Sequence, residues 1–267
     1  MVFDTDHLID VPLRVRRQRP LIHAITNWVT ANEVANCLHA IGARPILAWA
    51  LEEVEEITAK SDALVLNLGT PSAERIEAMI LAGKRANQEG RPVVFDPVGA
   101  GGSKFRTESS KRILSELRIT VIRGNQAEIG VLEGREGRWG GVDAISGPDD
   151  LEQLGYNLAL ETKAIVVATG PWDLILSLHK RRIVENGHPM MGQITGMGCM
   201  LTAVIAAFNA VADDPMVATV SAVGFFGLAG ELAGLHSLGP GSFKPAFFDA
   251  LSSLTPDQMR RGLKLKS

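Results

Sequence analysis

The stretch Pro92-Val93-Val94-Phe95-Asp96-Pro97-Val98-Gly99 has the pattern that best indicates the fold class. Its apolar run, 92–95, is followed at once by a carboxylate and then by a glycine turn. A short apolar run bounded by turn residues is typical of a buried strand. The same order of apolar run and glycine-containing polar turn recurs at 63–70, 119–125 and 164–170. We therefore predict strands over 63–66, 92–95, 119–122 and 164–168.

Segments with helical periodicity separate these strands. Ile76, Met79, Ile80 and Gly83 follow the i, i+3, i+4, i+7 spacing of one helix face. Further helices are predicted around 113–117 and over 125–132, 149–162, 199–211, 215–237 and 245–254, with an entirely helical pattern from Cys199 onward and a hairpin at 173–178 and 182–184. Strands that alternate with helices imply an α/β fold with a mostly parallel central sheet and helices on both faces.

Charge and composition exclude several classes of protein. The chain has 267 residues, of which 46% are hydrophobic, and this argues against a disordered chain. With 27 Lys and Arg against 30 Asp and Glu, the net charge of −3 offers no large basic field for nucleic acid. Two cysteines exclude a disulfide scaffold and a cysteine-rich metal site.

Two segments of the sequence bear on membrane targeting. Residues 1–20 lack the apolar core of a signal peptide. The apolar stretch 216–235 contains Glu231, which a membrane span would normally avoid, so we predict a buried helix there. We expect a cytoplasmic protein with no membrane partner.

Polar side chains follow each predicted strand. These turns are Asn67-Leu68-Gly69-Thr70, Asp96-Pro97-Val98-Gly99, Arg123-Gly124-Asn125 and Thr169-Gly170. Ligands of parallel sheets bind beyond the carboxyl ends of the strands, so the four turns together indicate a binding site. The alternative is that they are ordinary strand-to-helix turns, which favour the same residues.

The phosphate-binding motif is not a familiar one. The chain has no G-x-x-x-x-G-K-[ST], and Gly99-Ala100-Gly101-Gly102-Ser103 fails G-x-G-x-x-G. A stronger candidate is Thr195-Gly196-Met197-Gly198-Cys199-Met200, which opens an apolar helix whose free N–H groups could bind a phosphoryl group. The alternative is a tight turn with a threonine cap. Cys199 would have a lowered pKa at this helix start, whereas Cys37 fits a buried position.

Phosphoryl transfer also requires a divalent cation. Asp96 follows a strand, and Asn125 and Glu128 lie three residues apart on one helix face. We expect Asp96 and Glu128 to hold Mg²⁺ indirectly, through water.

At this level of detail the sequence resembles the hydroxyethylthiazole kinases of the ribokinase-like superfamily. The segments that carry the resemblance span about 20–254, and they are Pro20-Leu21-Ile22-His23-Ala24-Ile25-Thr26-Asn27, Leu66-Asn67-Leu68-Gly69-Thr70, Phe95-Asp96-Pro97-Val98-Gly99-Ala100-Gly101, Val121-Ile122-Arg123-Gly124-Asn125-Gln126-Ala127-Glu128-Ile129, Asn186-Gly187-His188-Pro189, Thr195-Gly196-Met197-Gly198-Cys199-Met200-Leu201 and Gly239-Pro240-Gly241-Ser242-Phe243. The resemblance implies a three-layer ribokinase-like fold. We expect one domain over 1–267, with 1–20 as an N-terminal extension or arm.

The resemblance also implies an activity and a set of site residues. The activity is ATP-dependent phosphorylation of the alcohol of 4-methyl-5-(2-hydroxyethyl)thiazole, which provides thiazole phosphate for thiamine diphosphate. By the same resemblance, Cys199 is the catalytic residue; Asn27, Leu47, Gly69 and Gly196 bind the thiazole; Arg123, Thr169, Asn125 and Gly198 bind ATP; and Asp96 and Glu128 lie at the Mg²⁺ region. The family is usually a homotrimer, in which Asn27 and Leu47 would face a neighbour's site.

Two positions depart from the family pattern, and two other functions stay open. Leu47 stands where the family usually has Met, and Trp49 stands where a smaller polar residue or His is expected. One alternative is another ribokinase-like kinase, acting on a hydroxymethylpyrimidine or a sugar. The other is a ligand-binding homologue without catalysis. Cysteine at position 199, where most of the superfamily has Asp, favours the thiazole kinases.

Overall fold

Nine strands form a single sheet in the computed structural model, which describes residues 5–134 and 148–267. In spatial order the strands are β2 (Arg44–Ile46), β1 (Leu21–Ile25), β3 (Ala63–Asn67), β4 (Val93–Asp96), β5 (Val121–Asn125), β6 (Ile165–Thr169), β7 (Asp173–Leu176), β8 (Arg181–Val184) and β9 (Leu265–Lys266). The pairs from β2 to β6 are parallel, and those from β6 to β9 are antiparallel.

The predicted strands and hairpin are confirmed. The four predicted strands are β3, β4, β5 and β6, with small shifts at their ends, and the predicted hairpin is β7 and β8. The prediction of a purely helical chain after Cys199 is wrong at its last residues, because β9 pairs with β8 there. The helix predicted over 245–254 begins earlier, at Pro240, where a proline suits a first helical turn.

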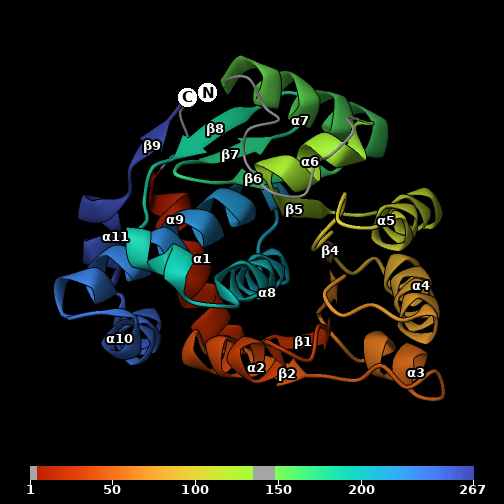
Figure 1. Cartoon of the computed structure of the whole chain (residues 1–267). Helices are drawn as coiled ribbons and strands as arrows, with labels where there is room; N and C mark the ends of the chain where they lie inside the picture. The colour runs from red at the N-terminus through yellow and green to blue at the C-terminus, as the bar shows by residue number, and fades with distance from the viewer. Residues whose placement is uncertain (1–4, 135–147) are drawn as a thin grey trace.

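Helices cover both faces of the sheet, as predicted (Figure 1). One face carries α1 (Thr5–Gln18), α2 (Ala31–Ala40), α8 (Met197–Asn209), α9 (Pro215–Leu235) and α10 (Pro240–Ser253), with α11 (Pro256–Gly262) beside α1 and α9. The other carries α3 (Val54–Ala59), α4 (Ala73–Gln88), α5 (Lys104–Glu116), α6 (Gln126–Leu132) and α7 (Pro148–Thr162). A short 3-10 helix, η2 (Pro189–Gln193), precedes α8.

The apolar helix α9 lies in the core. By length and composition it could cross a membrane, but 83% of its most apolar window is buried inside the structure. It packs against α1, α8 and α10, and Glu231 near its end pairs with Lys264 at 3.0 Å. The interpretation of this stretch as a buried helix is therefore confirmed.

The described part of the expected N-terminal extension is packed into the same core. Leu8, Ile9, Val11 and Val15 of α1 are buried, and Ser221 Oγ of α9 donates to the Leu8 carbonyl at 2.6 Å. Residues 1–4 lie outside the described part. From residue 5 onward this segment thus forms a helix that packs on the core of the sheet.

Candidate functional site

A chain of buried polar side chains crosses the carboxyl ends of β1, β3 and β4. Asn27 Nδ2 donates to Asn67 Oδ1 at 2.9 Å, and Asn67 Nδ2 donates to Asp96 Oδ2 at 2.8 Å. Asn27 Nδ2 also donates to Cys199 Sγ at 3.3 Å. These four residues, here called the polar chain, link the first turn of α8 to the centre of the sheet. Because the three strands are parallel neighbours, their last residues meet at one edge.

Asp96 is the most heavily buried charge of this site. Burial raises the pKa of Asp96 to about 6, and the nearby Glu128 charge acts in the same direction. Arg123 lies 3.7 Å away and opposes the rise, as do hydrogen bonds from Thr202 and Asn67. Asp96 Oδ1 has no hydrogen-bond partner within residues 5–134 and 148–267. One carboxylate oxygen is therefore fixed by the protein and the other is available.

The prediction of a lowered pKa for Cys199 is wrong. Burial, together with the charge of Asp96, raises the pKa of the Cys199 thiol. The hydrogen bond from Asn27 and the charge of Arg123 oppose this rise without cancelling it. A helix start favours a thiolate only where the thiol keeps its solvation. Cys199 is consequently a neutral thiol at neutral pH.

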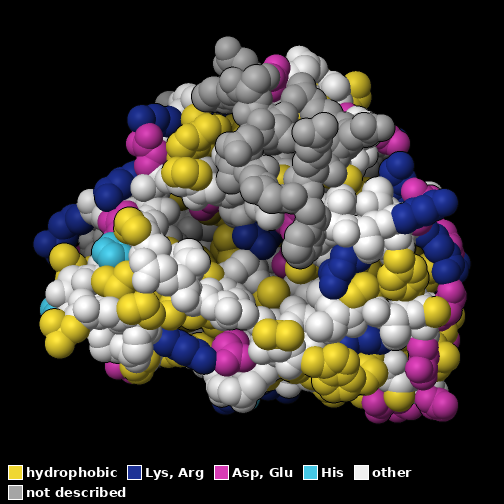
Figure 2. Space-filling view, in the orientation of Figure 1, with side chains coloured by type: hydrophobic (Ala, Val, Ile, Leu, Met, Phe, Trp, Pro, Cys, Tyr) yellow, Lys and Arg dark blue, Asp and Glu magenta, His cyan; other side chains and the backbone are white. Residues whose placement is uncertain are grey.

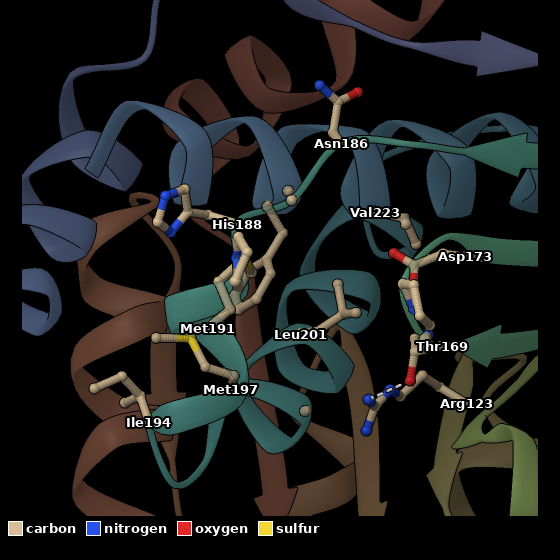
Figure 3. Close-up of a pocket in the computed structure, with 18 of the residues that line it drawn as sticks. Arg123, Thr169, Asp173, Asn186, His188, Met191, Ile194, Met197, Leu201 and Val223 are labelled. Carbon is tan, nitrogen blue, oxygen red and sulfur yellow. Dashed lines mark hydrogen bonds between the residues drawn. The ribbon is translucent and has the colours of Figure 1, made fainter. Parts of the chain in front are cut away.

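A large cavity opens beside the polar chain, on the side of β5 and β6. It has a volume of about 710 Å³, and its walls include Arg123, Thr169 and Gly198. Arg123 Nη2 donates to Thr169 Oγ1 at 2.6 Å, which fixes the guanidinium toward the cavity (Figure 3). A Cβ on Gly198 would lie only 2.9 Å from Arg123 Cζ, so the glycine makes room for the guanidinium.

The cavity has one polar and one apolar side. Figure 3 shows Arg123, Thr169 and Asp173 along one side, and Met191, Ile194 and Met197 across from them. Burial raises the pKa of Asp173 to about 6, although Arg123 and the Gly170 N–H oppose the rise. A site with a basic group at one end and apolar walls at the other suits a ligand that combines phosphate with a ring.

Asn125 and Glu128 form a separate unit at the start of α6. Asn125 Oδ1 accepts from the Glu128 N–H, and Glu128 Oε2 accepts from the Asn125 N–H, both at 2.8 Å. Glu128 Oε1 also accepts from the Gly99 N–H at 2.8 Å. Both carboxylate oxygens of Glu128 thus accept a hydrogen bond from a backbone N–H, so a metal ion would reach Glu128 more readily through water. The described residues contain no cluster of three or more His, Cys, Asp or Glu side chains that could enclose a metal.

The expected thiazole-site residues lie on the α2 side of the polar chain. A Cβ on Gly69 would lie 2.6 Å from Asn27 Cβ, so only glycine permits this approach. Gly196 caps α8 with a φ of 95°, in the left-handed region that favours glycine. Leu47 lies just beyond β2 and packs half-buried on the same core as Cys199. The glycines therefore flank the polar chain, whereas Leu47 lies at the edge of the sheet.

Three residues of the site were missed by reasoning from the sequence. Asn67 lies in one of the four turns that follow the predicted strands, and the sequence alone does not show that it joins Asn27 to Asp96. Thr202 donates to Asp96 from α8 at 2.9 Å, and its place one turn after Gly198 was the signal that could have shown it. Asp173 opens β7 opposite Arg123, and only the sheet order brings the two together.

The outer surface beside the site carries an apolar patch. Figure 2 shows a hollow near the middle of this face, lined by apolar and basic side chains, and a group of large apolar side chains below it. Trp28, Val29 and Leu51 are 60%, 63% and 39% exposed, and the Trp49 ring meets Trp28 edge-on at 4.5 Å. We call these four residues the apolar patch.

Comparisons with known proteins agree on one family. The model of the hydroxyethylthiazole kinase family matches residues 13–257. A hydroxyethylthiazole kinase of Thermoanaerobacter pseudethanolicus is 50% identical over 254 residues, which cover 94% of this chain and 96% of the relative. The solved structure of hydroxyethylthiazole kinase from Pyrococcus horikoshii covers 98% of both chains at 40% identity with a TM-score of 0.91. A ribokinase-like superfamily protein from Enterococcus faecalis shares the fold at 11% identity, with a TM-score of 0.65 and coverage of 95% and 96%.

Proposed function

The chain belongs to the hydroxyethylthiazole kinase family, and from that premise we propose how its residues divide the work of the reaction. The reaction moves a phosphoryl group from ATP to the hydroxyl of 4-methyl-5-(2-hydroxyethyl)thiazole, in thiamine biosynthesis. One observation carries the proposal: the polar chain joins Cys199 to Asp96 and Arg123 at the border between two halves of one site. The halves bind the acceptor and the nucleotide.

The acceptor half comprises Asn27, Leu47, Gly69 and Gly196. Asn27 is 4% exposed and held from two sides, by Asn67 and by the Thr30 N–H, which donates to Asn27 Oδ1 at 3.1 Å. Gly69 and Gly196 let the side chains of Asn27 and Thr30 pack closely against the backbone, and Leu47 supplies apolar surface. A small apolar ring with one alcohol fits this combination.

The nucleotide half comprises Arg123, Thr169, Asn125 and Gly198. Arg123 brings positive charge to the cavity, and Thr169 orients it. The first N–H groups of α8, at Gly198 and its neighbours, lie beside this guanidinium. Phosphoryl oxygens that gain charge during transfer would be stabilised by both. The apolar wall of the cavity would then take the nucleobase.

We propose that Cys199 orients the acceptor hydroxyl and does not remove its proton early. Because its thiol is neutral, Sγ would accept a hydrogen bond from the hydroxyl while it accepts another from Asn27. The new bond forms between the hydroxyl oxygen and the γ-phosphorus, and the bond from that phosphorus to the oxygen of ADP breaks. In a loose transition state the hydroxyl keeps its proton until late and then releases it to an oxygen of the transferred phosphoryl group and on to water, so a strong base is not required.

Asp96 and Glu128 have the features of a partial Mg²⁺ shell. Asp96 Oδ1 is buried without a partner among the described residues, and Glu128 could contribute through water. Mg²⁺ usually takes one or two carboxylates and fills its other positions with water and substrate phosphates. When bound, the ion would neutralise charge on the phosphates of ATP. We propose these two residues as its protein contacts.

The division into halves is tested by steady-state kinetics with both substrates varied. Asn27→Ala should raise KM for the thiazole alcohol and leave KM for ATP close to wild type. Arg123→Ala should raise KM for ATP and lower kcat, because it removes charge from the phosphoryl site. The assignment is wrong if Asn27→Ala raises KM for ATP and not KM for the thiazole alcohol. It is also wrong if each variant raises the two KM values equally.

We also propose that the chain acts as one domain in a cytoplasmic homotrimer, with active sites near subunit interfaces. The apolar patch supports assembly, because exposed tryptophan and valine beside a site are typical of an interface. The net charge of −3 supports small-molecule partners over nucleic acid. Light scattering should give a mass of three chains. Val29→Glu should lower the mass, whereas Leu160→Glu, an exposed leucine on α7, should not.

A further inference from the structure

One buried arginine near the acceptor half has no part in the proposed reaction. Arg75 lies in the first turn of α4 and is only 5% exposed. Within the part of the chain that the structure describes, no carboxylate forms an ion pair with it. A buried guanidinium without a countercharge is costly, and burial lowers the pKa of Arg75. Its surroundings must therefore compensate in another way.

The compensation comes from two tryptophans and two oxygen atoms. The guanidinium carbon lies 4.9 Å from the centre of the Trp28 ring and 5.2 Å from that of Trp49. Aromatic faces stabilise a cation at such distances, and more strongly when it is desolvated. Nη2 donates to the Thr26 carbonyl, and Nη1 donates to Thr70 Oγ1 at 3.4 Å.

These contacts join the three loops that follow β1, β2 and β3. Thr26 and Trp28 belong to the first loop, Trp49 to the second and Thr70 to the third. Thr70 has a φ of 43°, an unfavourable region for a β-branched residue. Its hydroxyl accepts from both Arg75 and the Trp28 N–H, the latter at 3.3 Å, and this holds the loop in place.

The position of Asn27 depends on the same loops. Asn27 directly follows Thr26, whose carbonyl Arg75 holds, and it packs against Gly69, which directly precedes Thr70. Asn27 in turn donates to Cys199 Sγ. A shift of the Thr26 carbonyl would thus move the amide that orients Cys199.

We propose that Arg75, packed against both Trp28 and Trp49, is a positioning residue that sets Asn27 for the acceptor alcohol. The proposal rests on the assignment of Asn27 to the acceptor half. It gives a role to Trp49, one of the two residues that depart from the family pattern. Arg75 itself touches neither substrate.

The test compares Arg75→Met, Arg75→Lys and Asn27→Ala with Arg85→Met. Arg85 lies on the same helix and pairs with Glu89 at its far end, so its loss controls for removing an arginine from α4. Arg75→Met should raise KM for the thiazole alcohol about 10- to 100-fold, the usual worth of hydrogen bonds from a charged donor. KM for ATP, the mass in light scattering and the Arg85→Met constants should stay at wild type. Arg75→Lys should recover part of the loss.

The double variant Arg75→Met/Asn27→Ala distinguishes positioning from general structural support. If Arg75 acts through Asn27, the double variant should have the KM of Asn27→Ala alone. The role of Arg75 is overturned if the two substitutions multiply each other's effect on KM for the thiazole alcohol. It is also overturned if Arg75→Met raises KM for the thiazole alcohol and KM for ATP equally. Both outcomes leave the assignment of Asn27 intact. A wild-type KM for the thiazole alcohol in Asn27→Ala overturns the acceptor assignment and this proposal with it. If Arg75→Met does not fold, Trp49→Leu should raise the same KM about 3-fold through one lost aromatic face, and an unchanged KM overturns the proposal.

Discussion

At the scale of single residues, the site contains a buried carboxylate, Asp96, whose ionisation destabilises the folded protein. Asp96 is fully buried, and its raised pKa means that the folded protein holds the proton more tightly than the unfolded chain does. Its ionised form therefore destabilises the fold at pH values above about 6, and this effect disappears below about pH 4, where both states are protonated. The proposed contact of Asp96 with Mg²⁺ would account for a carboxylate at this position.

Asp96→Asn should abolish turnover and make the protein more stable. The amide oxygen can still accept from Asn67 and Thr202, while the buried charge is gone. At pH 7.5 we expect a gain on the order of 2 kcal/mol, or several degrees in Tm, that shrinks as the pH falls toward 4. Calorimetric melts at both pH values check this. A lower Tm at pH 7.5 would show that the carboxylate supports the fold.

Cys199 should show no titration in the neutral range. Because burial and Asp96 raise the pKa of its thiol, kcat should stay flat from pH 7 to about 8.5, a range above the pKa of Asp96. Cys199→Ala should lower kcat about 10²-fold at every pH in this range, at the lower end for a group that contacts a reacting proton. A pH–rate series measures both. A rise in kcat over this range that Cys199→Ala removes would identify a thiolate base.

The candidate residues could be predicted where the sheet itself brings them together. Asp96 and Thr169 end β4 and β6, and Arg123 lies two residues before the end of β5, so a strand pattern was enough to place them near one edge of the sheet. Thr202 and Asp173 reach the site from elements whose position depends on packing, which no local pattern contains. The pKa direction of Cys199 was missed for the same reason, since burial is a property of the whole fold.

At the scale of elements, the start of α8 connects the two halves of the site. Gly196 gives the left-handed turn, Gly198 admits Arg123, and Cys199 reaches the acceptor side. Four residues of the proposed site thus lie within about two helical turns, because Thr202 also donates to Asp96. Small changes there should affect nucleotide and acceptor binding differently.

Gly198→Ala should weaken ATP binding. Its Cβ would come within 2.8 Å of Arg123 Nη2, so the guanidinium must leave its place beside Thr169. We expect KM for ATP to rise about 10-fold, as for the loss of one charge-assisted hydrogen bond. Initial rates at varied ATP measure this. Gly241→Ala, where a Cβ meets open space, is the matched control, and equal constants in the two variants would contradict the expectation.

Strand and helix prediction failed where elements are short or interrupted by polar side chains. β1 contains His23, which is buried with Nδ1 2.9 Å from Thr58 Oγ1 and Nε2 2.7 Å from the Ala48 carbonyl oxygen. β2 and β9 span only Arg44–Ile46 and Leu265–Lys266, too few residues for a periodicity. Long apolar elements such as α9 were predicted well because their composition alone implies burial.

At the scale of the whole molecule, α1 contributes to stability although none of the proposed site residues lies on it. Leu8 is fully buried, whereas Leu13 on the same helix is 36% exposed. Leu8→Ala should cost about 2–5 kcal/mol and lower Tm by roughly 5–15 °C, because it opens a cavity in the core. Leu13→Ala should change Tm little. Thermal melts of both variants measure these changes in Tm. Equal melting temperatures for Leu8→Ala and Leu13→Ala would mean that α1 packs only weakly on the domain.

The most direct test of the whole account is an ADP-release assay with Mg-ATP and a panel of acceptors. The panel contains 4-methyl-5-(2-hydroxyethyl)thiazole, a hydroxymethylpyrimidine and simple sugars. The account predicts that ADP appears in step with thiazole phosphate and that the other acceptors give none above background. Preferred turnover of the pyrimidine or a sugar, or binding of the thiazole without ADP release, would contradict it.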